Sequence, residues 1–335
     1  MKSNRLIAVI SVVFLCIFVI FSAGQATAKP IKFAITVNMD DAGGMAAATM
    51  KENVEQWSGG DMIINLFPGS QLGGMREHYE ACQSGAIEMV YVAASAASKF
   101  ATEVGVLDLP FLFPTDYDEA WEIIDGDLTN LLSQKLEEKG FKLLGIAPYG
   151  FKAITTSKKQ VKSLQDLAGM KIRIMPSKTL ELTYLAWGAV PTPIEFAELY
   201  VALQQGVVDG EENGLTVIKA QRFNEVQDYL TISKHALFCG LLVANKRWFD
   251  GLSDDERSIV LKAAGENIQQ QRKFVAEEDE NIIKYLGENG MEVYHLTEEQ
   301  VEEFREASIP VHEEFAKLSE ENKVALDTVF NSINK

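Results

Sequence analysis

The chain has 335 residues, of which 47% are hydrophobic and 24% charged, a composition typical of a globular protein long enough for two domains. Its 48 acidic and 31 basic side chains give a net charge of −17, which disfavours binding to a nucleic-acid backbone. The three cysteines, with no C-x-x-C spacing, exclude a disulfide-dense scaffold, a zinc ribbon and a thioredoxin-like redox site. The four histidines leave little for a His-based metal cluster, and we expect neither a metal site nor a cofactor.

The first 28 residues have the pattern of an export signal. Lys2 and Arg5 precede an apolar run at 6–21, and Ala28 closes a small-x-small cleavage site. The apolar run is shorter than the roughly 20 residues of a membrane-spanning helix, so we expect cleavage after Ala28 and a periplasmic mature chain. The segment contains two basic residues and no acidic one, which brings the mature net charge to −19.

Strands and helices are predicted to alternate along the mature chain. The first part is predicted to form strands at 31–37, 61–67, 87–92 and 141–146 and helices at 45–57, 75–84 and 117–138. The second part is predicted to form strands at 151–156, 170–174 and 207–209, helices at 178–187 and 193–204, and an apolar stretch at 236–245. Helices at 253–285, 297–316 and 319–334 follow. The pattern favours two α/β units, and the helix at 253–285 is long enough to brace both.

Arg173 and Asn213 lie near predicted strand ends, where an open α/β sheet binds ligands, and Lys152 lies near the start of the second unit. Arg173 offers a guanidinium that grips a carboxylate with two parallel hydrogen bonds, although spacing alone slightly favours a solvated arginine. Asn213 follows the strand at 207–209, where a helix N-cap is the favoured role from spacing. Lys152 either adds a positive charge to the same cleft or is solvated.

The remaining candidate residues favour structural roles. Phe196, like three other aromatic side chains, either lines a pocket or belongs to the core, and His235 is expected to be a hydrogen-bonded structural histidine. The other three aromatics are Tyr91, Phe111 and Trp187. The acidic pairs at 40–41 and 211–212 lack the spacing of a calcium loop and are predicted to be solvated. Cys82 and Cys239 either pair or are two small buried residues.

Catalytic signatures are missing from the sequence. There is no G-x-S-x-G elbow, no G-x-x-x-x-G-K-[ST] loop, no G-x-G-x-x-G and no H-E-x-x-H. This absence disfavours the common exported hydrolases.

Five segments in a fixed order resemble one family, the substrate-binding (P) subunits of tripartite ATP-independent periplasmic (TRAP) transporters, or dicarboxylate-binding DctP family. The segments are FPGSQLGG at 67–74, DLPFLF at 108–113, LQDLAGMKIRI at 164–174, GAVPTPI at 188–194 and ELYVALQQGVVDGEEN at 198–213. The resemblance covers nearly the whole mature chain.

The resemblance implies a two-lobe α/β periplasmic-binding-protein fold with hinge segments, a long helix bridging both lobes and a ligand cleft between them. We expect lobe I at 29–150 plus 240–279 and lobe II at 151–239 plus 280–335.

The resemblance also implies the ligand contacts. Arg173 matches the family arginine that pairs with the ligand carboxylate, Asn213 an amide that faces the ligand, and Phe196 a cleft aromatic. The position of Lys152 is commonly arginine in the family. Where an arginine would offer a second bidentate contact to the ligand, this sequence offers the point charge of a lysine. The segment at 38–45 lacks the His-Pro often found in the family, and 93–95 has only small side chains.

The implied function is that of an extracytoplasmic solute receptor. It binds a small organic anion and delivers it to a membrane permease with a small and a large subunit, driven by an ion gradient. We expect a monomer without enzymatic activity. The ligand stays open among a C4-dicarboxylate, a 2-oxo or hydroxy acid, an aromatic acid, a sugar acid and a sulfonate. The alternative functions are presentation of a ligand to a sensor kinase and catalysis by an exported enzyme.

Overall fold

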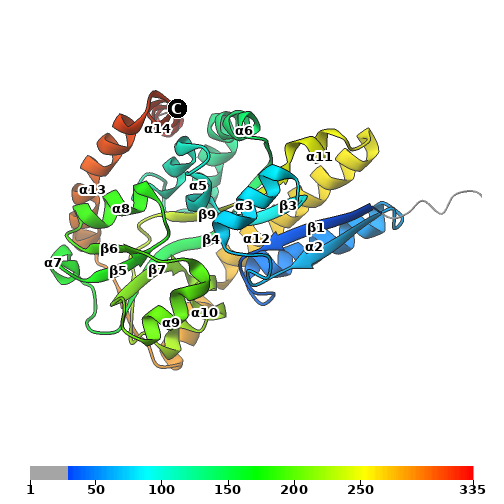
Figure 1. Cartoon of the computed structure of the whole chain (residues 1–335). Coiled ribbons are helices and arrows are strands. Elements are labelled where there is room, and N and C mark those ends of the chain that lie inside the picture. Colours follow the sequence, from blue (N-terminus) through cyan, green and yellow to red (C-terminus); the bar gives the residue numbers. More distant parts are fainter. Residues whose placement is uncertain (1–28, 335) are drawn as a thin grey trace, which may run out of the picture.

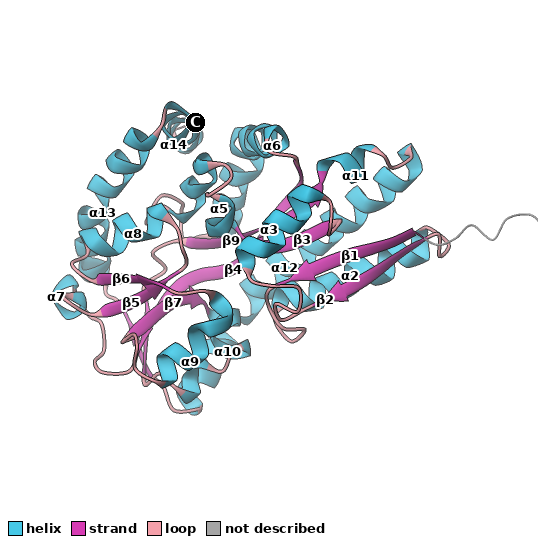
Figure 2. Cartoon of the chain, viewed as in Figure 1, coloured by secondary structure: helices cyan, strands magenta, loops and turns pink. Residues whose placement is uncertain are grey.

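The computed structural model describes residues 29–334. The predicted export signal and its cleavage site after Ala28 lie outside the described residues. Strands run through the centre of the molecule and helices cover them on both sides (Figures 1 and 2). Within residues 29–334, no helix combines the length and the apolar character needed to cross a membrane.

One strand path joins two parallel sheets. Its order is β2 (Met62–Phe67), β1 (Lys29–Ile35), β3 (Met89–Ala93), β9 (Leu237–Asn245), β4 (Phe141–Thr156), β7 (Gly210–Gly214), β5 (Lys171–Ile174) and β6 (Val190–Pro193). Strands β2, β1 and β3 are mutually parallel, as are β7, β5 and β6, whereas β9 and β4 run antiparallel to each other. Strand β8 (Tyr229–Ile232) pairs with β4 and with β10 (Glu292–His295). The two parallel sheets are the centres of two lobes.

Helices pack around the sheet of each lobe. The first lobe contains α2 (Ala42–Trp57), α3 (Met75–Ser84), α4 (Ala94–Ala97), α5 (Tyr117–Ile123) and α6 (Thr129–Glu138). The second contains α7 (Leu164–Leu167), α8 (Lys178–Ala186), α9 (Leu199–Gln204) and α10 (Leu215–Ala220). The chain ends with α11 (Lys246–Asp250), α12 (Asp254–Glu288), α13 (Glu298–Leu318) and α14 (Glu320–Ile333). The residue boundaries expected for the lobes stay a prediction.

Strand β4 passes from one lobe to the other. Its first part pairs with β9, and residues 152–156 pair with β7. The prediction of two separate strands at 141–146 and 151–156 is therefore wrong. The strand is continuous because β9 supplies hydrogen-bond partners across the segment between them. Gly145, with φ 159°, allows close packing, since a Cβ at this position would lie 2.0 Å from Cδ1 of Ile268 in α12.

Helix α12 confirms the predicted bridge. Ser253 caps it in a reciprocal pair with Glu256, and the helix packs against α2 and β4 and also against α10 and β10. Arg272 of α12 donates to Asp125 and to the carbonyl of Ile146. Its 35 residues span about 52 Å at 1.5 Å per residue, enough to reach both lobes.

Three other predicted elements were wrong. The helix predicted at 117–138 is interrupted at Gly126, whose ψ of −134° is not helical. The helix predicted at 193–204 begins only after β6 and a 3-10 turn at 196–198, because β6 pairs with β5. The strand predicted at 207–209 lies instead at 210–214, where β4 and β5 offer partners. Cys82 and Cys239 are both buried and unpaired.

Candidate ligand-binding site

A small cavity lies where the two lobes meet. It contains about 200 Å³ of empty space. On one side lie the two residues that follow β1, the last residue of β3 and the first residue of α3. They face one residue each from β7, the 3-10 turn and α10, and β4 and β9 each add one residue. This is the carboxyl-end edge of parallel strands, where α/β sheets bind ligands. The lining residues are Thr36, Val37, Met75, Ala93, Tyr149, Phe196, Asn213, Val217 and Phe238.

Arg173 is buried beside this cavity with an unpaired charge. It is 1% exposed, and its Nε donates to the carbonyl of Ile194 at 2.9 Å. Neither Nη1 nor Nη2 has a hydrogen-bond partner among residues 29–334, and no carboxylate there forms a salt bridge with it. Its guanidinium carbon lies 6.0 Å from the ring centroid of Phe196, a cavity residue. The solvated arginine that spacing alone favoured is therefore wrong.

The guanidinium of Arg173 remains charged at neutral pH. Burial lowers its pKa to about 10, and the nearby carboxylates of Glu211, Glu212 and Glu195 oppose this shift. Since two of its nitrogens have no partner, the side chain can hold an anionic group by paired hydrogen bonds.

Asn213 lies on β7 and lines the cavity. The register of β5 and β7 places Glu211 beside Arg173, and Asn213 follows on the same face of β7. The Asn213 amide donates to the Glu211 carboxylate, which also accepts from the Thr155 hydroxyl at 2.7 Å. Burial raises the pKa of Glu211 to about 7. The N-cap of α10 is Gly214, so the capping role that spacing favoured for Asn213 is wrong.

Lys152 is buried in an ion-pair cluster. Its Nζ lies 2.8 Å from Oε1 of Glu212, 3.8 Å from Oδ1 of Asp108 and 5.2 Å from the ring centroid of Phe238. Its side chain is fully buried rather than solvated. The ligand contact expected for Lys152 stays a prediction. The charge of the Lys152 ammonium is already balanced by the carboxylates of Glu212 and Asp108.

His235 has the structural role predicted for it. Its Nε2 lies 3.1 Å from Oε2 of Glu212, and its Nδ1 lies 2.7 Å from the hydroxyl of Ser233. Burial lowers the pKa of His235, so a neutral imidazole protonated on Nε2 donates to Glu212 and accepts from Ser233. Burial also opposes ionisation of Glu212, but Lys152 and His235 hold its pKa below the ordinary value.

Three acidic side chains predicted to be solvated are buried instead. Glu211 and Glu212 are 0% and 1% exposed because each has partners on neighbouring strands. Asp41 is 1% exposed and caps α2 by accepting from the Gly43 amide at 2.9 Å. Asp40 is exposed, as predicted.

Two cavity hydroxyls were missed by sequence reasoning. Thr36 Oγ1 and the Tyr149 hydroxyl are buried without a hydrogen-bond partner in the described part of the chain. No motif marks either residue, because only the folded arrangement brings them to the cavity. Residues 29–334 contain no cluster of three or more His, Cys, Asp or Glu side chains able to hold a metal ion.

The family model described as bacterial extracellular solute-binding protein, family 7 (DctP), matches residues 33–318. The chain is 36% identical over 299 residues to the C4-dicarboxylate-binding periplasmic protein DctP of Rhodobacter capsulatus, covering 87% of this chain and 88% of that protein. The sugar acid binding protein DctPAm of Advenella mimigardefordensis, solved with galactonate, is 32% identical with a TM-score of 0.87, covering 91% of this chain and 99% of that one.

A TRAP periplasmic solute binding protein of Sulfurospirillum deleyianum, solved with succinate, is 31% identical with a TM-score of 0.84, covering 90% of this chain and 97% of that one. These relatives are receptors rather than enzymes, and neither of the two alternative functions is supported. The chain belongs to family 7 of the bacterial extracellular solute-binding proteins and is a solute receptor of the TRAP type that works with membrane permease subunits.

Proposed function

We propose that the receptor holds the carboxylate of a small organic anion against Arg173, with Asn213 and Phe196 completing the contact. The observation that carries this proposal is the buried guanidinium with two unpartnered nitrogens beside a cavity. An unpaired buried charge is costly, and a ligand carboxylate would supply the missing charge and two oriented acceptors.

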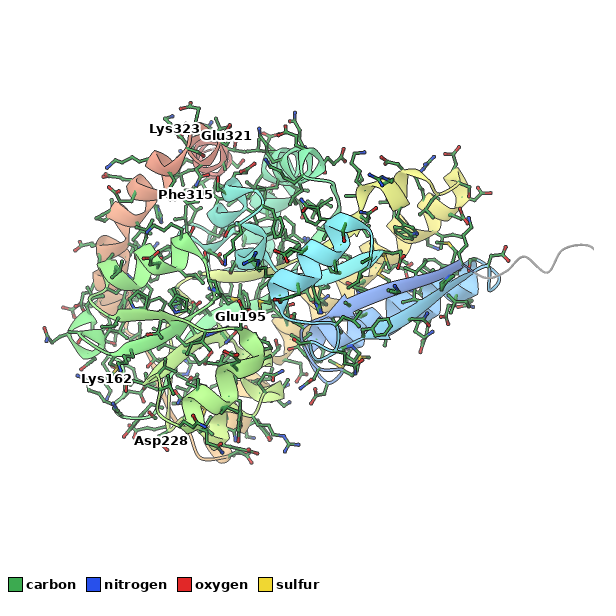
Figure 3. All side chains as sticks on the ribbon, in the orientation of Figure 1. Lys162, Glu195, Asp228, Phe315, Glu321 and Lys323 are labelled. Carbon is green, nitrogen blue, oxygen red and sulfur yellow. The ribbon has the colours of Figure 1, made fainter. Side chains whose placement is uncertain are left out.

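Closure of the lobes around the ligand accounts for delivery to the permease. Glu195, labelled in Figure 3, lies where the second lobe meets the first. Its Oε2 is 3.5 Å from the place that a Cβ on Gly74, the N-cap of α3, would occupy. Contacts of this kind exist only with the lobes together, so ligand binding favours the closed form and opening releases the ligand. The proposal includes a monomeric receptor that matures by cleavage after Ala28.

Ligand binding by an Arg173→Ala variant tests the proposal. The mature chain, freed of co-purified ligand, is screened by thermal shift against small carboxylates and sulfonates. A ligand at 100 times its Kd adds about 2.7 kcal/mol of stability, which raises Tm by several degrees. The rise is expected in the wild type and in Arg257→Ala, a control on the surface of α12, and is expected to vanish in Arg173→Ala.

Circular dichroism shows whether Arg173→Ala keeps its fold. A folded variant that binds the anion with unchanged affinity overturns the proposal.

A further inference from the structure

The two buried cations near the cavity differ in whether their charge is already balanced. Lys152 has two carboxylates within 4 Å, those of Glu212 and Asp108, whereas Arg173 has no salt bridge among the described residues. The site can therefore neutralise one incoming negative charge, at Arg173. None of the described residues that line the cavity is a lysine or arginine, so a second carboxylate on the ligand would find no cation among them.

Strand register separates the two cations further. Lys152 pairs with Gly214 in the ladder of β4 and β7, so it shares a face with Glu212. Arg173 is the register partner of Glu211, so both lie on the other face of the sheet, as does Asn213. A ligand carboxylate on Arg173 is thus on the face opposite to Lys152.

Two acidic side chains belong to the immediate neighbourhood of the guanidinium. Glu211 is the register partner of Arg173 on β7, and Glu195 follows Ile194, whose carbonyl accepts from Arg173. One ligand carboxylate is favourable because Arg173 compensates it, but a second would be repelled by these carboxylates in a desolvated site.

The cavity walls are mostly apolar. Val37, Met75, Val217 and Phe238 supply aliphatic and aromatic surface. Apart from Asn213, the polar side chains of the wall are Thr36 and Tyr149, whose hydroxyls have no partner among residues 29–334. Only about 10 Å³ of this space admits a water-sized molecule, far below the roughly 300–1,000 Å³ of ordinary small-molecule pockets. Such walls suit a short carbon chain with one additional oxygen.

We infer that the ligand is a small monocarboxylate with a short apolar chain and a hydroxy or oxo group beside the carboxylate. The inference rests on the proposed carboxylate contact at Arg173. Dicarboxylates and polyhydroxy sugar acids, represented by the succinate and galactonate of the two solved relatives, are then poor ligands of this chain.

Matched ligands test the inference on the wild-type mature chain by calorimetry. 2-Hydroxybutanoate and malate share a four-carbon chain and a 2-hydroxyl and differ in a terminal methyl or carboxylate group. We expect 2-hydroxybutanoate to bind at least about tenfold more tightly than malate, and succinate and galactonate to bind no better than malate. Arg173-dependent binding of malate, succinate or galactonate at equal or higher affinity overturns the inference and leaves the proposed function standing. Failure of every carboxylate to bind overturns both.

Two volume-conserving variants test the role of the hydroxyls. The wild type is expected to prefer 2-hydroxybutanoate over butanoate by several-fold, since the 2-hydroxyl meets the unpartnered hydroxyls of the wall. Thr36→Val and Tyr149→Phe are each expected to reduce the ratio of the two affinities, because each removes one hydroxyl from the wall. An unchanged preference in both variants and in their combination contradicts the assignment of this wall to the ligand oxygen.

Discussion

Replacing Lys152 with methionine is expected to affect stability more than ligand binding. The ammonium lies 2.8 Å from Glu212 and 3.8 Å from Asp108, and all three side chains are at most 2% exposed. The variant leaves buried carboxylates without their cation. Breaking a buried pair in this way costs about 3–5 kcal/mol.

Urea unfolding at pH 7.5 measures the free energy of unfolding of the variant, and calorimetry measures its Kd. Lys178→Met is the matched control, because Lys178 is 53% exposed and its pair with Glu181 should contribute less than about 1 kcal/mol. Combining Lys152→Met with Glu212→Gln should recover part of the lost stability, since one of the stranded charges is removed. A Lys152→Met variant of wild-type stability that loses ligand as completely as Arg173→Ala would show that Lys152 is a ligand contact and not a structural cation.

Three further predictions concern pH, packing and helix capping. Burial raises the pKa of Asp41 from 3.8 to about 7, so the native state binds this proton more tightly than the unfolded state, and stability falls as pH rises from about 4 to about 7. Asp41→Asn keeps the oxygen that caps α2. When Tm is measured against pH, this variant should lose less stability with rising pH than the wild type and should be the more stable of the two above about pH 7. An unchanged curve would contradict the assignment of this pH dependence to Asp41. Gly214→Ala places a Cβ 2.0 Å from the Tyr149 carbonyl oxygen and should cost about 1–3 kcal/mol in urea unfolding, whereas Gly265→Ala in α12, with open space around it, should be stabilising. Ser253→Ala should cost about 1 kcal/mol in the same assay by removing the cap of α12, and no loss would show that the cap is redundant.

Local sequence signals predicted the elements that depend on local interactions. Helix α3 has the predicted bounds of 75–84, and α12 begins at the capping box that marked its start. Elements that depend on distant partners were missed. Strand β4 continues through Pro148 and Gly150 because β9 pairs with it, and β6 is a strand because β5 is beside it. A single sequence does not show which strands will be neighbours.

The same limit applies to the site. Spacing alone favoured a solvated Arg173 and a capping Asn213, and only the family resemblance pointed to ligand contact. Adjacent residues of a strand face opposite sides, so Glu211 and Glu212 enter two different networks. Their neighbours are set by the register of β4, β5 and β7, which no local pattern encodes.

The connection between the lobes has a mechanical consequence. Two hydrogen-bonded strands, β4 and β9, and the helix α12 cross together from one lobe to the other. Two strands and a helix that cross side by side allow the lobes to bend about one axis. They resist twisting, because a twist would displace the hydrogen-bonded strands and the packed helix at the same time. With the proposed closure, the lobes are expected to open and close along a single coordinate, so that ligand occupancy would set one distance between two points on the receptor surface.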